Sequence, residues 1–419
     1  MNQLKAEILE ICQKAKESVK SMALLDENTK NNILLEVKNL IIFNQEKILE
    51  ANDIDVKNAQ KNQLESSKID RLILNKDKIL AMAKSIDEIV KLPDPVGKII
   101  FETNRPNGLN IKRISTPIGV LLTIYEARPN VTLDVAMLSI KSGNVAILRS
   151  GSEALNSSKI LASFFQEALK KFNVNENAIT FCKNPHRDLV KGLLKMDKFI
   201  DVVIPRGGKS LILAVSKQSK IPVFKHLDGN CHTYIHEKAD FEKARKILLN
   251  AKMRRVGICG ATESLLIDKK IAPQIIPILI DDLTNLGCEV RGSSDAKRID
   301  ARIKNASIKD YYTEYLDKIL SLKIVKNIDE AIAHIDKFGS SHTESIVTED
   351  KEMAQKFLNE VNSAIVMHNA STQFADGGEF GFGAEVGIAT GKIHARGPVG
   401  LEQLTIYKYQ IVADCAIRQ

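Results

Sequence analysis

The chain has 419 residues, of which 60 are basic and 52 acidic, for a net charge of +8, and 44% are hydrophobic. Such a composition predicts a globular protein with a core that needs no disulfide or metal staples, divided into two or three domains. The basic residues are mixed with acidic ones along the chain and aromatic residues make up only 5%, so a nucleic-acid-binding surface is not indicated.

Six scattered cysteines form no C-x-x-C pair, which argues against a disulfide framework or zinc ribbon and favours a reducing compartment. No apolar run approaches the roughly 18 residues of a membrane span, so no membrane partner is expected. The polar, helical pattern of Met1 to Cys12 is not that of a signal peptide. A cytoplasmic location is therefore expected.

Everything before the first proline, Pro93, has a helical pattern. Apolar residues recur at helical spacing, and Asp26 or Asn28 could cap the second helix. The segment carries no recognisable chemistry, so we expect a helical layer. A Pro-Asn-Gly turn at Pro106 to Gly108 then predicts a β-hairpin over residues 98–118.

From Gly119 onward, apolar runs alternate with helical stretches, which predicts doubly wound parallel sheets in two α/β domains. The strands expected in the first set are Val120 to Tyr125, Asn144 to Leu148, Phe199 to Ile204 and Ile221 to Phe224, and those in the second are Ser264 to Ile267, Glu289 to Arg291, Ser345 to Thr348 and Ser363 to Met367. A loop from Gly377 to Gly400 holds eight of the 22 glycines, and Leu404 to Val412 reads as a final strand. Ordering so many glycines is costly, so we expect a functional loop.

Cys259 is the cysteine whose surroundings best suit a reactive thiolate. It lies in R-R-V-G-I-C-G-A-T-E, where Gly257 and Gly260 leave room for a substrate. Arg254 and Arg255 could lower the pKa of the thiol or hold an anion. On local sequence alone, a buried structural cysteine is an equally good interpretation, and Cys231 in D-G-N-C-H is the one rival.

Three further stretches follow expected strands and resemble ligand-binding turns. E-A-R-P-N-V-T-L-D places Asn130 at the start of a helix, either as an ordinary cap or as a side-chain donor to an oxyanion. R-S-G-S-E, from Arg149 to Glu153, and P-R-G-G-K-S, from Pro205 to Ser210, combine a cation, a flexible turn and a helix start, as nucleotide phosphates and ribose require. Neither a G-x-G-x-x-G fingerprint nor a Walker loop is present.

Three histidines, His226, His232 and His236, lie close together in the sequence. The strand-like residues between the last two place them on one face, but no third ligand is evident. We therefore expect no metal site.

Six blocks of the sequence together resemble those of one family. They are P-I-G-V-L-L-T-I-Y-E-A-R-P-N-V-T-L-D, L-R-S-G-S-E-A, I-P-R-G-G-K-S-L-I, D-G-N-C-H, N-A-S-T-Q-F-A-D-G-G and R-G-P-V-G-L-E. The family that they resemble is the gamma-glutamyl phosphate reductases, the NADPH-dependent enzymes of proline biosynthesis, which are related to the aldehyde dehydrogenases. The resemblance runs from about Ala6 to the carboxyl terminus.

The resemblance implies an aldehyde dehydrogenase-like fold with four parts. Residues 1–97 and 119–230 would form the NADPH-binding domain with its helical layer, and residues 231–375 the catalytic domain. Residues 98–118 and 401–419 would form a β flap for homo-oligomerisation, as a dimer or tetramer, and residues 376–400 a glycine-rich loop that returns to the nucleotide domain. Contact with glutamate 5-kinase, which makes the labile substrate, stays open.

The same resemblance implies roles for individual residues. Cys259 would be the nucleophile and would form a thioester with the acyl group of L-glutamate 5-phosphate, while Asn130 and the Cys259 N–H would hold the oxyanion. The residues implied for NADPH are Arg149, Ser152, Glu153, Arg206, Gly207 and Gly208. The residues implied for the substrate are Arg128, Arg254, Arg255, Asn369, Ser371 and Thr372.

At two positions the chain departs from related proteins. The family usually has asparagine after the cysteine, where this chain has Gly260. Aldehyde-oxidising relatives carry a water-activating glutamate in an E-L-G-G block, where this chain has H-L-D-G from His226 to Gly229. The missing base favours acyl-phosphate reduction over oxidation of a semialdehyde, although Asp228 could substitute. A non-catalytic homologue is a third possibility, against which the retention of Cys259 and Asn130 argues.

Overall fold

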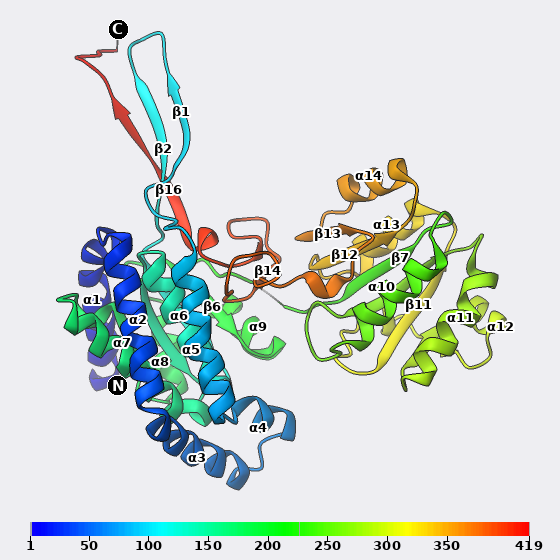
Figure 1. The fold of residues 1–419 in the computed structure, drawn as a ribbon, viewed down its shortest axis with the longest axis horizontal. Helices are drawn as coiled ribbons and strands as arrows, with labels where there is room; N and C mark the ends of the chain where they lie inside the picture. The colour runs from blue at the N-terminus through cyan, green and yellow to red at the C-terminus, as the bar shows by residue number, and fades with distance from the viewer. Residues whose placement is uncertain (1, 226, 419) are drawn as a thin grey trace. The chain divides into compact units, whose positions relative to one another are not determined.

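The computed structural model of the protein describes residues 2–225 and 227–418, and the chain divides into two compact units. Unit 1 comprises Met1–Lys225, Gly381–Gly387 and Pro398–Gln419, and unit 2 comprises His226–Phe380 and Ile388–Gly397. Each unit is built on a parallel β-sheet with helices, and a small antiparallel sheet belongs to unit 1 (Figure 1). The expected fold class is therefore confirmed. Within the described residues, no helix is both long and apolar enough to cross a membrane.

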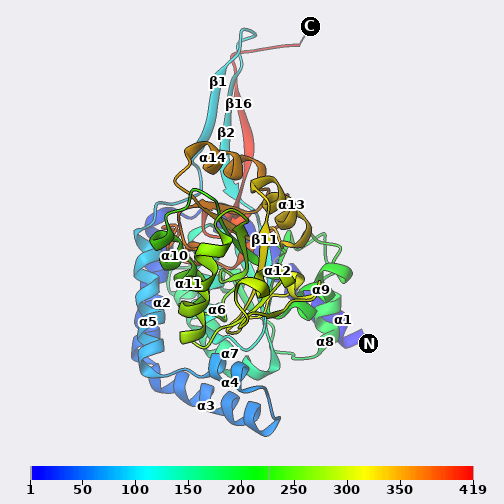
Figure 2. The ribbon, with the colours of Figure 1, turned by 90° about the vertical axis from the view of Figure 1, so that its right-hand side faces the viewer.

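The amino-terminal layer is helical, as the sequence predicts. Its helices are α1 (Asn2–Ala23), α2 (Glu27–Phe43), α3 (Gln45–Lys61), α4 (Ser66–Leu72) and α5 (Lys76–Lys91). Of the two caps considered for α2, Asp26 is the one used, since its side chain accepts a hydrogen bond from the Thr29 N–H. Helices α2 and α5 lie side by side and contact each other (Figures 1 and 2).

The parallel sheet of unit 1 has the strand order β5-β4-β3-β6. Its strands are β3 (Val120–Tyr125), β4 (Val145–Ser150), β5 (Ile179–Phe181) and β6 (Val202–Arg206), and the helices between and after them are α6 (Pro129–Lys141), α7 (Leu155–Lys171), α8 (Arg187–Leu193) and α9 (Lys209–Gln218). Strands β3 and β4 are fully buried, which explains their continuous apolar runs. Both are followed directly by the turns in which the candidate ligand-binding residues lie.

One expected strand of unit 1 is wrong. The run from Ile221 to Phe224 forms only an isolated bridge, in which Val223 pairs with Val203. Pro222 lies within this run and has no N–H to donate to a ladder, so pairing does not extend into a full strand.

The predicted hairpin forms a three-stranded antiparallel sheet with the last strand of the chain. Its strands are β1 (Ile99–Asn104), β2 (Asn110–Pro117) and β16 (Thr405–Val412), with β2 in the centre. The turn places Gly108 at φ +85°, which only glycine adopts without strain. The sheet extends away from the helices of unit 1 (Figure 1).

Unit 2 contains a seven-stranded parallel sheet in the order β10-β9-β11-β8-β7-β12-β13. The strands are β7 (Cys231–Ile235), β8 (Thr262–Asp268), β9 (Glu289–Gly292), β10 (Lys304–Asn305), β11 (Ile319–Val325), β12 (Thr343–Val347) and β13 (Ile365–His368), and the helices are α10 (Phe241–Met253), α11 (Ala272–Asn285), α12 (Ser294–Ile299), α13 (Ile328–Phe338) and α14 (Lys351–Glu360).

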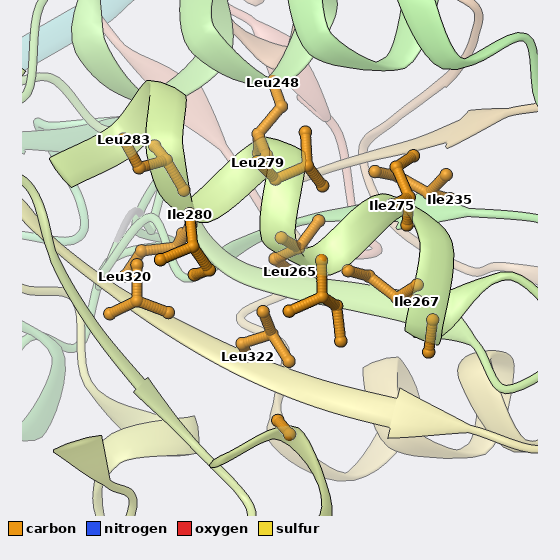
Figure 3. Packing of buried hydrophobic residues seen from close by; sticks show 14 of the residues in the cluster. Ile235, Leu248, Leu265, Ile267, Ile275, Leu279, Ile280, Leu283, Leu320 and Leu322 are labelled. Atoms are coloured by element: carbon orange, nitrogen blue, oxygen red, sulfur yellow. The ribbon is translucent and has the colours of Figure 1, made fainter. Parts of the chain in front are cut away.

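Alternating side chains of this sheet enter two separate cores. Leu265 and Ile267 of β8 pack with α10 and α11, in the cluster that Figure 3 shows. Leu266, between them in the sequence, packs in a second cluster with residues of α13 and α14. The alternation shows that the sheet is covered by helices on both faces, as a doubly wound fold requires.

Short elements complete the fold. The glycine-rich segment contains two paired two-residue strands, β14 (Ile388–Ala389) and β15 (Gly397–Pro398). The 3-10 turns among the described residues are η1 (Ser152–Ala154), η2 (Glu176–Ala178), η3 (Asp310–Tyr312), η4 (Thr372–Phe374) and η5 (Glu402–Leu404).

Candidate active site

Cys259 lies in the loop between α10 and β8, which we call the cysteine loop (residues 254–261). Its side chain is partly buried and packs beside a small apolar cluster that includes Met367 and Ala375. Four of the other cysteines, Cys12, Cys182, Cys231 and Cys288, are buried, and burial raises the pKa of each thiol. A raised pKa disfavours the thiolate, so none of these four suits a nucleophile. Cys415, the remaining cysteine, is exposed near the carboxyl terminus.

Cys231, the rival to Cys259 on sequence, supports the backbone of the cysteine loop. Its thiol is fully buried on β7 and donates a hydrogen bond to the Cys259 carbonyl oxygen at 3.1 Å. Gly229, two residues earlier, packs so closely that an added Cβ would lie 2.1 Å from that same oxygen. The D-G-N-C block therefore acts as a platform that fixes the position of Cys259 within unit 2.

A buried ion pair joins the two elements that flank the cysteine loop. Lys252 of α10 and Glu263 of β8 meet at 2.5 Å, and both side chains are completely buried. The Leu316 N–H donates to the second carboxylate oxygen of Glu263 at 3.1 Å. Burial raises the pKa of Glu263 to about 7, although Lys252 acts in the opposite direction. The pair therefore joins the two ends of the loop that carries Cys259.

The turn η4 provides a third support. The buried side-chain amide of Gln373 donates to the Ala251 carbonyl at 2.9 Å and to the Arg255 carbonyl at 3.4 Å. An added Cβ on Gly260 would lie 3.1 Å from the Thr372 carbonyl oxygen, closer than side chains normally approach. Gly260 therefore packs closely against η4, and a larger side chain there would require a small shift of its neighbour.

The residues implied for the substrate occupy two different environments. Arg254 and Arg255 are exposed at the start of the cysteine loop. Asn369 instead bonds the backbone of Thr348, with its amide accepting from the N–H and donating to the carbonyl, both at 3.0 Å. Ser371 caps η4, and the Thr372 hydroxyl lies 3.0 Å from the Thr262 hydroxyl, both in buried positions. All three polar side chains have hydrogen-bond partners within the chain. Their role as a substrate anchor stays a prediction.

Asn130 lies in unit 1, in the first turn of α6, directly after the β3 strand. It is not the helix cap, because Arg128 occupies that position without a side-chain cap bond. The Asn130 side chain is exposed, and its amide nitrogen donates to Asp134 at 3.1 Å. An exposed amide donor at a helix amino terminus can stabilise a developing oxyanion.

Arg149 and Glu153 hold the turn after β4. Arg149 is 9% exposed, and its guanidinium donates to the carbonyls of Ser150 and Pro185 at 2.5 and 2.6 Å. The Glu153 carboxylate folds back over Gly151 and accepts from the Ala127 N–H at 2.8 Å. Ser152, between them, is exposed. That Arg149 and Glu153 also meet a nucleotide ribose or its 2′-phosphate stays a prediction.

The turn after β6 leads into α9 and offers an amide to an anion. Gly208 caps α9, is exposed, and donates its N–H to the Glu126 carboxylate at 3.0 Å. An added Cβ on Gly207 would lie 2.5 Å from the same carboxylate. The amino terminus of α9 thus already binds a negative group, as it would have to do to bind a pyrophosphate. That Arg206, Gly207 and Gly208 hold the pyrophosphate of a dinucleotide stays a prediction.

His232 and His236, on and after β7, are buried in unit 2 and have partners there. His232 pairs with Glu344 at 2.9 Å, and His236 with the Thr348 hydroxyl at 2.9 Å. His226 lies outside the described residues. Over residues 2–225 and 227–418, no group of three potential metal-binding side chains is found.

Sequence reasoning missed the residues that support this chemistry. Asp134 lies within the E-A-R-P-N-V-T-L-D block, four positions after Asn130. This helical spacing indicates that the two side chains lie on the same face of the helix. Gly229 was also in a quoted block. For Lys252 and Gln373 there was no local signal, because their contacts depend on how α10, β8 and η4 meet in the fold.

Known proteins are similar to this chain over nearly its whole length. A sequence model described as the aldehyde dehydrogenase family matches residues 2–312. The gamma-glutamyl phosphate reductase of Rhodospirillum rubrum is 49% identical over 404 residues, covering 96% of this chain and 95% of the relative. The crystal structure of gamma-glutamyl phosphate reductase from Thermotoga maritima superposes with a TM-score of 0.96 at 42% identity, covering 99% of this chain and 100% of that chain.

An engineered glycolyl-CoA reductase solved with bound NADP+ shares the fold. The TM-score is 0.67 at 16% identity, with 97% of this chain and 96% of that chain covered.

Proposed function

Because the chain belongs to the aldehyde dehydrogenase family and, within it, to the gamma-glutamyl phosphate reductases, we propose that it reduces L-glutamate 5-phosphate to L-glutamate 5-semialdehyde and phosphate. The reducing cofactor is NADPH, and the reaction is the second step of proline biosynthesis from glutamate, in the cytoplasm. The observation that carries the proposal is the partly exposed Cys259 on its fixed loop, among cysteines that are otherwise buried or outside the folded sheets.

In this mechanism the Cys259 thiolate attacks the acyl carbon of the substrate. The carbon–sulfur bond forms, the carbon–oxygen bond to phosphate breaks, and phosphate leaves with the bonding electrons. A thiolate suits this reaction because it is a good nucleophile and later a good leaving group. When the thioester carbon has gained a hydride, the carbon–sulfur bond breaks, the aldehyde is released and the thiolate is restored.

Both halves of the reaction place a negative charge on the acyl oxygen. The Asn130 amide nitrogen and the Cys259 backbone N–H are the donors that we assign to this oxyanion. Gly260 has no side chain that could donate to the oxyanion, so we assign this role to the Cys259 backbone N–H. Arg128, Arg254 and Arg255 are assigned to the phosphate and carboxylate of the substrate, and Asn369, Ser371 and Thr372 to its far end.

The residues of unit 1 fit a dinucleotide. When bound, NADPH supplies the hydride. Arg206, Gly207 and Gly208 would hold its pyrophosphate at the start of α9, where the Gly208 amide already attracts a carboxylate. Arg149, Ser152 and Glu153 would lie near the adenosine ribose, and the positive charge of Arg149 suits a 2′-phosphate.

The domain assignment follows from these roles. Residues 1–97 and 119–230 form the NADPH-binding domain, residues 231–375 the catalytic domain, and residues 376–400 the returning loop. Residues 98–118 and 401–419 form the oligomerisation flap of a homodimer or homotetramer. A contact with glutamate 5-kinase would pass on the labile substrate.

Semialdehyde oxidation by hydrolysis of the thioester is the alternative within the same family. That reaction needs a base for the deacylating water, and L-D-G stands here in place of the glutamate block. A reductase gains nothing from such a base. The two reactions differ in one measurable way, which is their dependence on phosphate.

The test measures the reverse reaction of the purified protein. We expect glutamate 5-semialdehyde to reduce NADP+ only when phosphate or arsenate is present, because the thioester needs an acceptor. Cys259→Ala should reduce the rate to background, whereas the matched control Cys415→Ser, at an exposed cysteine, should keep the wild-type rate. If Cys259→Ala keeps its activity, the nucleophile is wrongly assigned. Activity that does not depend on phosphate would favour the oxidising alternative.

A further inference from the structure

Asp134 faces the proposed oxyanion donor from one helical turn further along α6. The Asn130 amide nitrogen donates to the Asp134 Oδ2 atom at 3.1 Å. The spacing is four residues, so the two side chains lie on the same face of the helix. Asp134 itself is partly buried, while Asn130 is exposed.

The chemistry of the pair fixes the orientation of the amide. A carboxylate can only accept hydrogen bonds, so the nitrogen of Asn130, and not its oxygen, must face Asp134. One N–H of the amide is used in this bond, and the second remains available. Without the carboxylate, the two ends of the amide differ little in shape, and an inverted amide would present an acceptor where a donor is needed.

We propose that Asp134 is a positioning residue that holds the Asn130 side chain with its amide nitrogen, and not its oxygen, available as the oxyanion donor. This inference rests on the proposed function, in which Asn130 holds the oxyanion. Asp134 acts only through Asn130 and does not itself contact the substrate.

The partly buried Asp134 carboxyl group lowers the free energy of unfolding when it is ionised. Burial raises the pKa of Asp134 to about 6, against the opposing effects of the Arg206 charge and the Asn130 hydrogen bond. The folded protein therefore binds a proton at Asp134 more tightly than the unfolded chain does. It follows that the unfolding free energy falls as pH rises from about 4 to 6, and the loss persists above that window.

A double-mutant cycle tests the role in catalysis. Asn130→Ala should lower kcat about 10²- to 10³-fold, the loss typical of an oxyanion donor. Asp134→Asn should lower kcat about 10-fold with KM nearly unchanged, the size of one charge-assisted hydrogen bond. The double variant should be no slower than Asn130→Ala, because Asp134 acts through that residue. The control Asp77→Asn, at an exposed position in the first turn of α5, should leave both constants unchanged.

Other outcomes of the cycle overturn the inference. If Asp134→Asn slows the Asn130→Ala variant by the same factor as the wild type, Asp134 acts independently of Asn130. If Asp134→Asn alone is fully active while Asn130→Ala is impaired, the amide needs no partner. A wild-type protein without phosphate-dependent activity refutes the proposed function itself, and with it the part of Asp134 in that reaction.

Thermal stability tests the contact without reference to activity. The melting temperature of Asp134→Asn should exceed that of the wild type above pH 6, and the difference should vanish towards pH 4. In the Asn130→Ala background the midpoint of this difference should move to higher pH, because the hydrogen bond that lowers the pKa of Asp134 is gone. A midpoint that does not move means that Asn130 does not bond the carboxylate, and the inference fails.

Discussion

Lys252 and Glu263 show how strongly single residues can control the cysteine loop. Both side chains are completely buried, at the last turn of α10 and the start of β8. Taking two charges out of water is expensive, and their attraction compensates only while both are present. The pair is therefore a sensitive point in the support of Cys259.

We predict that Lys252→Met destabilises the protein by about 3–5 kcal/mol, because it leaves the Glu263 carboxyl buried without its partner. The double variant Lys252→Met/Glu263→Leu should recover most of this loss, since no buried charge then remains. Urea denaturation of the three proteins measures both effects.

Lys14→Met is the matched control, since Lys14 pairs with Glu10 on the exposed face of α1, and it should change stability little. A double variant less stable than Lys252→Met would contradict this account of the pair.

Functional residues that lie in a recognisable short sequence block could be predicted from the sequence. Residues whose role depends on contacts between distant elements could not. Cys259 and Asn130 stand in short blocks beside glycines and strand ends, where chemistry-bearing residues collect. Lys252 and Glu263 are eleven positions apart and meet only because α10 packs beside β8. Arg149 looked like a ligand for phosphate, but sequence alone could not show that its guanidinium bonds two backbone carbonyls.

At the scale of elements, regular patterns predicted most of the fold. Strand β3 has the expected bounds, because its continuous apolar run matches its burial. The sequence pattern predicts neither strand β5 nor strand β11, and only part of β7 is strand-like. Polar and charged residues interrupt the apolar pattern of β7 and β11, and buried partners such as Glu344, which bonds His232, accommodate them.

The cysteine loop itself yields a prediction with a control inside the same region. Gly229→Ala would press a methyl group against the Cys259 carbonyl, where an ideal Cβ lies 2.1 Å from the oxygen. Since the backbone there is the obstacle, the loop has to move. A displacement of about 1 Å can cost on the order of 10²-fold in rate. We expect losses of this order in kcat/KM, with slower alkylation of Cys259 by iodoacetamide.

Gly257→Ala is the control, because no atom lies within 4 Å of an added Cβ at that position of the loop. The alkylation rate of Cys259 should stay close to that of the wild type, because the added methyl group does not displace the loop. Equal effects of the two substitutions would mean that the loop responds to lost glycine flexibility and not to the contact with Gly229.

At the scale of the whole molecule, the three-stranded sheet leaves an apolar surface exposed. Tyr409 and Ile411 of β16 are each 58% exposed. They alternate with Lys408 and Gln410, so the two apolar side chains share one face of the sheet. In the register of the sheet, Tyr409 pairs with Arg113 of β2, which in turn pairs with Phe101 of β1. Exposed apolar faces and free strand edges of this kind favour association with another chain.

We therefore predict that the protein self-associates through this face and that Tyr409→Glu/Ile411→Lys leaves a single chain, because charges on this face would be desolvated on association. Light scattering coupled to gel filtration measures the mass directly. Lys408→Glu, which changes charge on the opposite face of the same strand, should leave the oligomer intact. The far-ultraviolet circular dichroism of all three proteins should agree, since β16 packs on β2 and contributes little to either core. A Tyr409→Glu/Ile411→Lys variant that keeps the wild-type mass would show that another surface joins the chains.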